Sequence, residues 1–428
     1  MVAILNSDVV PVDGARRPCI AILLGAPLNA QNLERIGIPY LSPYADIVVF
    51  DCKPWLGRSD AGLHHETADW DILETIVSPE GLKQALRRHR PDYALDFVGL
   101  VSLTPVIQRI LAAAGTCFVV QKSGNLPQPS RRARREWFLR MRREAQAPAG
   151  ASFAGSLKKP PSSLLRRVKQ RILGKWMFYR TLLAPDLALL AGSASLDRFT
   201  RRSRRILWVG SQDYHLSQRA SMQRPDGLPD GPYVVFVDDN IPYASDWSLL
   251  GRPVPVSPEG YYPAMRRFLF QLEEQWGVPV VIAAHPSARH DERVRRGFGE
   301  QHELIHGRTA DLVRDAQAVL LHGSTAVSFA VLGNKPLLFL SSRELQRSSY
   351  GLHIQTMADE LGHNPINIDG DGTIPSLESL APYSPFYAHY VDRYLCRKGC
   401  METGPWQAFI DYIEAARMGS HRKMDEFE

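Results

Sequence analysis

The chain has 428 residues, of which 44% are apolar and 22% are charged, and its net charge is +6. These values are ordinary for a water-soluble protein, and no apolar run approaches the roughly 20 residues that a membrane-spanning helix needs. A chain of this length is too long for one compact core and predicts at least two domains. Five cysteines are too few for a disulfide framework, so we expect a reduced, cytoplasmic protein.

Short apolar runs alternate with helical patterns in the first part of the chain. The strand-like runs are CIAILLGA, ADIVVFD, DYALDFVG and TCFVVQK. Between them, segments such as GLKQALRRHR carry apolar residues three and four positions apart, which is typical of amphipathic helices. Strands separated by helices predict a parallel sheet with helical crossovers, so we expect a Rossmann-like domain at about residues 15–128.

Residues 129–199 interrupt this pattern and form a basic amphipathic insert or linker. Between residues 131 and 180 the sequence holds 15 Lys or Arg but only two acids, Glu136 and Glu144, so this segment carries the basic charge of the chain. A helix over residues 164–176 would have an apolar face and a basic face. Such a helix can lie on an anionic membrane surface, or it can pack between domains with its basic face in water. We expect no nucleic-acid partner, because no nucleic-acid-binding motif accompanies the charge.

A second alternating series occupies about residues 200–400, and residues 401–428 predict a terminal helix that can cross back onto the first domain. The strand-like runs of this series are RRILWVG, PYVVFVDDN, VPVVIAAHP, AVLLHG and PLLFLS. The predicted fold class is therefore α/β, with two Rossmann-like domains whose parallel sheets face each other across a cleft. Near the end of the series, Cys396 and Cys400 stand at helical spacing, which would also allow a two-ligand metal site.

Polar residues follow four apolar runs of the second series, at the positions where open parallel sheets bind their ligands. These residues are Gly210 and Ser211, Asp238 and Asp239, His285 and Pro286, and Gly323, Ser324 and Thr325. We expect the four strand ends to converge on one edge of the second sheet. Taken singly, each is also what an ordinary loop would show.

The residue types at these strand ends suit a phosphate. Gly323 permits a close backbone approach, and Ser324 or Thr325 can cap the next helix, whose free amides attract an anion. Pro286 biases His285 to an extended conformation, where its imidazole can donate to a phosphate oxygen or protonate a leaving group. The alternatives are a plain helix cap and a plain loop exit.

Asp238 and Asp239 are the carboxylates best placed to act as a nucleophile or a base. Because the two charges are adjacent, the pKa of one can be raised. A turn capped by an aspartate is the structural alternative for either residue. Matching strand-end positions in the first domain, from which an acceptor could be reached, are held by Asp51, Asp96, Lys122 and Ser123.

The run AAHPSAR, followed downstream by HGSTAVSFAVLGNKPLLFL, resembles the bacterial capsule and lipopolysaccharide glycosyltransferases, which include Kdo transferases and polysialyltransferases. The resemblance covers about residues 238–340. It implies a GT-B fold with the nucleotide-sugar donor in the C-terminal domain. It assigns His285, Pro286, Ser324 and Thr325 to the phosphate of a cytidine nucleotide. The first domain lacks the acidic pair followed by glycine that polysialyltransferases have.

The resemblance implies an enzyme that moves Kdo or a sialic-acid-like ulosonate from a CMP-activated donor to a cell-surface polysaccharide or lipopolysaccharide acceptor. No cofactor or metal is implied, and Asp239 is the first candidate for the catalytic carboxylate, ahead of Asp238 and Asp96. Such acceptors are built at the membrane, so the basic segment 131–180 predicts peripheral attachment to the inner face of the cytoplasmic membrane. The alternatives are a CDP-glycerol or polyol-phosphate transferase, a UDP-sugar epimerase, and a noncatalytic partner that binds glycan or lipid.

Overall fold

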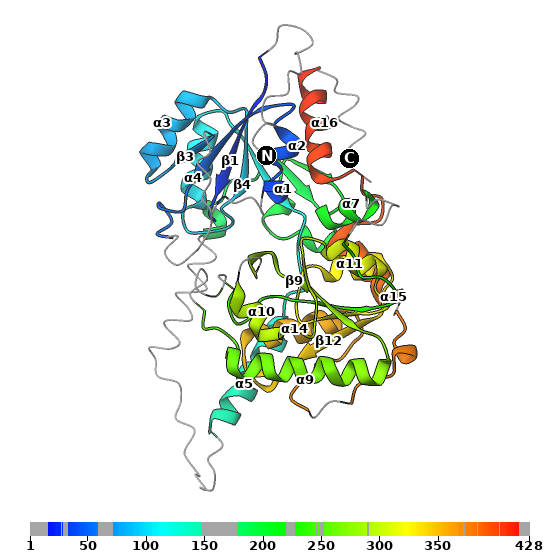
Figure 1. Cartoon of the computed structure of the whole chain (residues 1–428). Coiled ribbons are helices and arrows are strands. Elements are labelled where there is room, and N and C mark those ends of the chain that lie inside the picture. Colours follow the sequence, from blue (N-terminus) through cyan, green and yellow to red (C-terminus); the bar gives the residue numbers. More distant parts are fainter. Residues whose placement is uncertain are drawn as a thin grey trace.

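The computed structural model shows two domains, each built around a parallel sheet with helices on its faces (Figure 1). The first sheet has seven strands in the order β3-β2-β1-β4-β5-β6-β7, and the second has six in the order β10-β9-β8-β11-β12-β13. The expected fold class, α/β with two Rossmann-like domains, is confirmed. The residues that the structure describes are 16–26, 28, 33–58, 72–146, 178–219, 227–244, 247, 252–288, 291–370, 373–382, 384–401 and 403–418.

The first sheet is apolar at its centre, where all six residues of β1 are buried because helices cover both faces of a parallel sheet. Its strands are β1 (Cys19–Leu24), β2 (Asp46–Asp51), β3 (Leu73–Thr75), β4 (Tyr93–Phe97), β5 (Cys117–Lys122), β6 (Leu187–Leu190) and β7 (Arg205–Trp208). Its helices include α1 (Leu33–Ile36), α2 (Ile38–Leu41), α3 (Pro79–His89) and α4 (Thr104–Ala113). The helix α3 begins where the Ser78 hydroxyl accepts a hydrogen bond from the Gly81 amide at 3.1 Å.

The second sheet has an apolar cluster on each face: Val234 and Phe236 of β8 join one cluster, and Val235 and Val237 join the other. Its strands are β8 (Val234–Val237), β9 (Val280–Ala284), β10 (Leu304–His306), β11 (Val319–Leu321), β12 (Leu337–Ser341) and β13 (Ile366–Asn367). Its helices include α9 (Pro258–Trp276), α10 (Glu292–Phe298), α11 (Thr309–Asp315), α12 (Val327–Leu332), α13 (Arg343–Arg347), α14 (Ser349–Glu360) and α15 (Ser384–Tyr390). Side chains therefore alternate between the two clusters, and the polar residues come only where the strands end.

Two strands lie in a different place from the one that the sequence predicted. The run that forms β7 was expected to open the second sheet, but it pairs with β6, and β6 pairs with β5 of the first sheet. The expectation for β7 was wrong, and β6 was not expected at all within the insert at 129–199. The first sheet therefore continues beyond the expected limit at residue 128. The pattern of a run predicts a strand, but it does not reveal which sheet the strand joins.

The basic segment is inserted between two neighbouring strands, β5 and β6, of the first sheet. Its first part forms α5 (Arg131–Gln146), which lies against the second domain (Figure 1). The indole nitrogen of Trp137 donates to the carbonyl of Gln346, in α13, at 3.2 Å. The amphipathic helix expected over 164–176 lies outside the described residues. Among the helices that are described, every one is too short or too polar to cross a membrane.

The chain returns to the first domain after the π-helix η5 (Val391–Leu395). The loop that follows runs beside β7, where the Met401 amide donates to the carbonyl of Trp208 at 3.0 Å. The terminal helix α16 (Pro405–Arg417) then packs on the first sheet, and its Trp406 side chain is buried in the core there. The chain therefore crosses between the two domains twice, once before β8 and once after η5.

The cysteines differ from the expectation in one respect. Cys19, Cys52 and Cys117 are free, but Cys396 and Cys400 are joined by a disulfide. This pair lies in the loop after η5, where Cys396 has an extended backbone, and not on a helix. The expectation that all five thiols are reduced was therefore wrong for this pair, and so was the alternative of a metal site on a helix.

The contact between η5 and the 3-10 helix η1 (Ser193–Ser195) generates a prediction. Gly192 precedes η1 with a φ of +69°, and a Cβ atom there would collide with the backbone of Arg393 in η5. We expect Gly192→Ala to lower the free energy of unfolding by about 3 kcal/mol, from backbone strain and overpacking together.

Gly115→Ala is the matched control, because Gly115 has a φ of +73° and open space around its Cβ position. It should cost only the strain, about 1 kcal/mol. Urea unfolding followed by circular dichroism measures both values. Equal losses in the two variants would show that the contact between η1 and η5 is not tightly packed.

Candidate functional site

A cleft of about 1100 Å³ lies where the two domains meet. Residues that follow β8, β9 and β11 line it, as do the start of α14, the segment before α5 and the first half of α5. Its polar and aromatic lining includes Arg35, Gln128, Arg134, Arg135, Trp137, Phe138, Asp238, Asp239, Trp247, Arg252, His285, Ser324, Thr325, Tyr350 and His353. Three of the four expected strand ends therefore converge at this one place.

Asp239 connects three of the elements that border the cleft. Its Oδ2 atom accepts a hydrogen bond from the Gly323 amide at 3.0 Å and another from the Tyr350 hydroxyl at 2.7 Å. Gly323 follows β11, and Tyr350 lies in the first turn of α14. The carboxylate is consequently held in one orientation at the edge of the cleft that it lines.

Asp238 is the buried member of the acidic pair, with 2% of its surface exposed. Burial, reinforced by the neighbouring charge of Asp239, raises the pKa of this carboxyl to about 7. Its Oδ1 atom accepts a hydrogen bond from the Asn240 amide at 2.9 Å. Both aspartates line the cleft, but they differ in environment: Asp239 is partly exposed, whereas Asp238 is buried and close to half-protonated at neutral pH.

His285 is oriented by the residues around its Nδ1 atom. The Ser287 amide lies 3.2 Å from Nδ1, and the Ser287 hydroxyl lies 2.7 Å from it. The Asn240 side-chain amide in turn donates to the Ser287 hydroxyl oxygen at 3.0 Å. Because a backbone N–H can only donate, Nδ1 is the acceptor and the neutral ring carries its proton on Nε2. Nε2–H is the donor that suits a phosphate oxygen.

Ser324 and Thr325 line the cleft, but the helix after them is shorter than expected. It begins at Val327 and has six residues. The Ser324 hydroxyl accepts from the Ala326 amide at 3.3 Å, so it caps a turn before the helix. The Gly323 amide donates to Asp239, so it is already engaged. An anion at this strand end would rely on the hydroxyls of Ser324 and Thr325.

Tyr350 and His353 are site residues that the sequence analysis missed. Both lie on α14, whose first turn is capped by the Ser348 hydroxyl. Burial lowers the pKa of His353 and raises that of Tyr350, so both side chains are neutral at pH 7. A signal was present: SSYGLHI places the two rings three residues apart, at the start of a helix that follows a predicted strand.

Gly210 and Ser211 are not among the residues that line the cleft. They follow β7 and thus belong to the first sheet. The Ser211 hydroxyl accepts from the Tyr214 amide at 3.1 Å, and the Ser211 amide donates to the carbonyl of Leu395. Ser211 therefore begins the helix α7 (Gln212–Arg219) and joins it to η5.

The acids of the first sheet, Asp51 and Asp96, are also not among the residues that line the cleft. Asp51 is paired with Lys53 at 3.5 Å. Asp96 accepts from the amides of Val98 and Gly99 at 2.9 and 3.2 Å, so its carboxylate caps a local turn. Burial raises the pKa of Asp96 to about 6.

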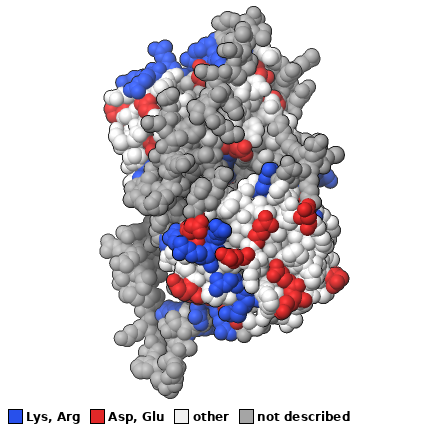
Figure 2. Space-filling model, viewed as in Figure 1, with Lys and Arg blue, Asp and Glu red and all other residues white. Residues whose placement is uncertain are grey.

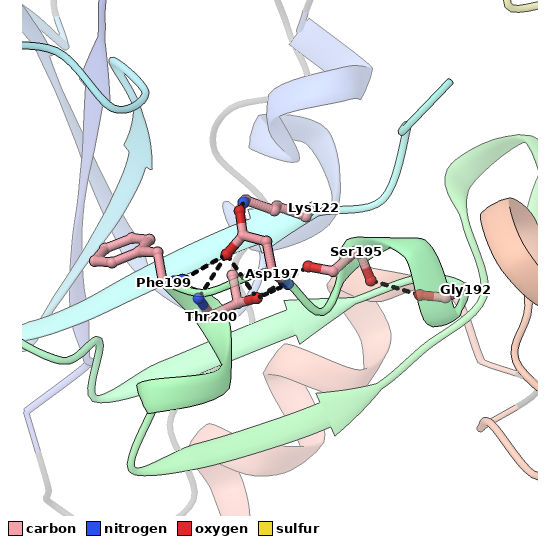
Figure 3. A network of polar contacts seen from close by, with 6 residues as sticks. All are labelled: Lys122, Gly192, Ser195, Asp197, Phe199 and Thr200. Carbon is pink, nitrogen blue, oxygen red and sulfur yellow. Dashed lines mark hydrogen bonds and ion pairs between the residues drawn. The ribbon is translucent and has the colours of Figure 1, made fainter. Parts of the chain in front are cut away.

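Lys122 and Ser123 follow β5 and are held by neighbours within the first domain. Lys122 pairs with Asp197, whose carboxylate also accepts from the Phe199 amide at 2.7 Å and the Thr200 amide at 2.9 Å (Figure 3). Ser123 accepts a hydrogen bond from the Gln121 side chain. Lys122 lines a second cavity of about 770 Å³, next to the cleft, together with residues of α14 and η5.

Two Rossmann-like domains that share a cleft, with a terminal helix that returns to the first domain, form the GT-B arrangement. The sequence matches no family model and no curated protein.

Solved structures with a similar overall layout include a variant of the wall teichoic acid polymerase TagF, with 11% identity, a TM-score of 0.46, and coverage of 94% of this chain and 89% of that one. The UDP-GlcNAc 2-epimerase of Neisseria meningitidis, bound to UDP-GlcNAc, has 10% identity, a TM-score of 0.43 and coverage of 92% and 99%. MurG of Acinetobacter baumannii has 9% identity, a TM-score of 0.41 and coverage of 93% and 99%. With identities and TM-scores this low, these likenesses carry no argument about the reaction.

The raised pKa of Asp238 predicts how stability depends on pH. The folded protein keeps this proton up to about pH 7, whereas the unfolded chain loses it near the ordinary aspartate value of 3.8. Asp238 therefore lowers the stability of the fold progressively as the pH rises from about 4 to 7. Asp238→Asn removes this effect, so the variant should gain stability over the wild type across that interval, by at most about 4 kcal/mol.

Urea unfolding of both proteins at several pH values between 4 and 8 measures this difference. Asp230→Asn, at an exposed carboxyl of the same domain, is the control and should change little. A gap between wild type and Asp238→Asn that does not vary with pH would contradict the assignment.

Proposed function

We propose that this protein is a GT-B glycosyltransferase that moves an acidic sugar, Kdo or a sialic-acid-like ulosonate, from a CMP-activated donor to a cell-surface polysaccharide or lipopolysaccharide acceptor. The observation that carries the proposal is the convergence of His285, Ser324, Thr325 and Asp239 on one cleft. The resemblance of the two sequence motifs that hold these residues supports the choice of a cytidine nucleotide.

In this proposal His285 and the hydroxyls of Ser324 and Thr325 bind the phosphate of the donor. The acceptor hydroxyl attacks the anomeric carbon, the bond from that carbon to the phosphate oxygen breaks, and CMP leaves. Nε2–H of His285 donates to the departing phosphate and stabilises its charge.

Asp239 is the proposed catalytic carboxylate, because it faces the cleft and is held in place by Gly323 and Tyr350. Its second oxygen takes the proton of the acceptor hydroxyl, or adds to the anomeric carbon if the reaction proceeds in two displacements. Asp238 supports it from the interior by keeping a proton near neutral pH, which limits repulsion between the two carboxyls. Asp96 remains a third candidate from the sequence alone.

The proposal predicts which nucleotide binds. CMP and CDP should raise the melting temperature of the wild type, whereas UDP should not. His285→Ala should weaken CMP binding about tenfold, because it removes one hydrogen bond to a charged group. His389→Ala, at an exposed imidazole of the same domain, is the control and should bind CMP as the wild type does.

Stabilisation by uridine nucleotides alone would contradict the proposal and favour a UDP-sugar epimerase. Turnover separates the remaining alternatives: transfer from CDP-glycerol but not from CMP-sugars would favour a polyol-phosphate transferase. Asp239→Asn should abolish transfer and retain CMP binding. A wild type that binds CMP but turns over no donor would favour a noncatalytic partner.

The basic segment supports a second part of the proposal, peripheral attachment to an anionic membrane. In α5, the apolar side chain of Leu139 is 40% exposed, on the same helix as the arginines at 131, 132, 140, 142 and 143. Basic side chains of the second domain also gather toward the left in Figure 2, the side on which α5 lies in Figure 1. Each Lys or Arg near an anionic surface contributes about 1 kcal/mol.

We predict that replacing residues 147–177 by a short Gly-Ser linker weakens binding to vesicles that contain phosphatidylserine. This replacement removes seven basic residues that follow α5 and keeps the cleft-lining part of α5 itself. Co-sedimentation with vesicles measures the effect, and neutral phosphatidylcholine vesicles are the control. Unchanged sedimentation would count against attachment through this segment.

A further inference from the structure

The helix α5 forms one wall of the cleft. The sequence pattern does not predict this position, and the proposed function does not depend on it. Its first turn begins at Ser130, whose hydroxyl accepts from the Ala133 amide at 3.0 Å. Trp137 and Arg140 both donate to the carbonyl of Gln346, at 3.2 and 3.4 Å, which fastens the helix to α13 of the second domain. Arg134 and Arg135 lie between the capped start of the helix and this attachment, so the docking of the helix places both beside the cleft.

Both arginines line the cleft and are exposed to it. Nε of Arg134 donates to the carbonyl of Pro129 at 3.0 Å, which orients its guanidinium and leaves the two terminal nitrogens for other acceptors. Within the described part of the chain, neither arginine has a carboxylate within ion-pair distance. By contrast, Arg132 on the same helix pairs with Glu136 at 2.7 Å.

The charges around the cleft do not balance. Its described lining includes four guanidinium groups, those of Arg35, Arg134, Arg135 and Arg252, but only two carboxyls. One of these, Asp238, is close to half-protonated at neutral pH, and the other, Asp239, already accepts two hydrogen bonds. A single phosphate diester carries one negative charge. The cleft therefore favours a ligand with a further anionic group.

We propose that Arg134 and Arg135 form an anion subsite that binds a second acidic group of the substrate, separate from the phosphate at His285, Ser324 and Thr325. A guanidinium suits a carboxylate or a phosphate equally, because either can accept two parallel hydrogen bonds. This inference rests on the proposed function for the place of the first phosphate, and there the second group is the carboxylate of the donor sugar. An acidic group of a lipid-linked acceptor is the other source.

The experiment compares acidic and neutral ligands that share one nucleotide type. The pairs are CMP-N-acetylneuraminate against its methyl ester, which lacks only the carboxylate charge, and UDP-glucuronate against UDP-glucose. Binding is measured by calorimetry for the wild type, for Arg134→Ala with Arg135→Ala, and for Arg142→Ala with Arg143→Ala. The last variant loses the same charge from the same helix, but its arginines are not among those that line the cleft.

The wild type should prefer the acidic ligand of the pair that it binds. The cleft variant should lose about tenfold or more in affinity for that ligand, with little change for the neutral one. The control variant should keep the preference. An unchanged preference in the cleft variant, together with an unchanged KM for the acceptor, would overturn the proposal, and so would an equal loss in both variants. A raised acceptor KM at unchanged donor affinity supports the subsite and assigns the anion to the acceptor.

Failure of the proposed function gives a different pattern. If the wild type binds uridine ligands, the cytidine assignment falls, but the comparison of acidic and neutral ligands still tests the arginine pair. If the wild type binds neither the cytidine nor the uridine ligands, inorganic pyrophosphate is used as the probe instead. A rise in melting temperature that is lost only in the cleft variant supports the subsite, and equal rises in all three proteins contradict it.

Discussion

One carboxylate oxygen holds together the elements that shape the cleft. Oδ2 of Asp239, just after β8, accepts from the amide after β11 and from the hydroxyl in the first turn of α14. Each contact crosses between segments far apart in the sequence, so the carboxylate fixes two loops and a helix relative to one another. Hydrogen bonds to a charged acceptor stabilise about twice as much as neutral ones do. The interaction directly positions Tyr350 and Gly323, the residue before Ser324.

The same constraint gives the two neighbouring aspartates different properties. Two carboxylates side by side repel each other, and in a buried site this repulsion favours a proton on one of them. Asp239 accepts two hydrogen bonds and is partly exposed at the cleft, whereas Asp238 is buried, which raises its pKa to about 7. The proton is therefore kept by the interior group. Two consecutive aspartates therefore have different environments. The sequence pattern alone could not predict which of the two carboxyls would keep the proton.

The sequence predicted the parts of the fold that depend on local pattern. Alternating strands and helices predicted two parallel sheets, and the rule that ligands bind at strand ends brought His285, Asp239 and Ser324 together correctly. What the sequence could not predict was pairing between distant segments. Arg205–Trp208 has the pattern of a strand whichever sheet it joins, so Ser211 was assigned to the wrong sheet edge. Tyr350 and His353 were missed because they sit on a helix whose approach to the cleft depends on tertiary packing.

The basic helix is the clearest case of this limit. Composition alone favoured a solvated or membrane-bound face for all of its arginines, since charge patterns carry no information about which side of a helix meets protein. The structure divides them: Trp137 docks the helix on the second domain, which turns Arg134 and Arg135 toward the cleft and leaves Arg142 and Arg143 outward. Because α5 is inserted between β5 and β6 of the first domain, any change in the angle between the domains must strain that docking or carry the helix along. A ligand that binds both α5 and the strand ends of the second domain would therefore hold the helix against that domain.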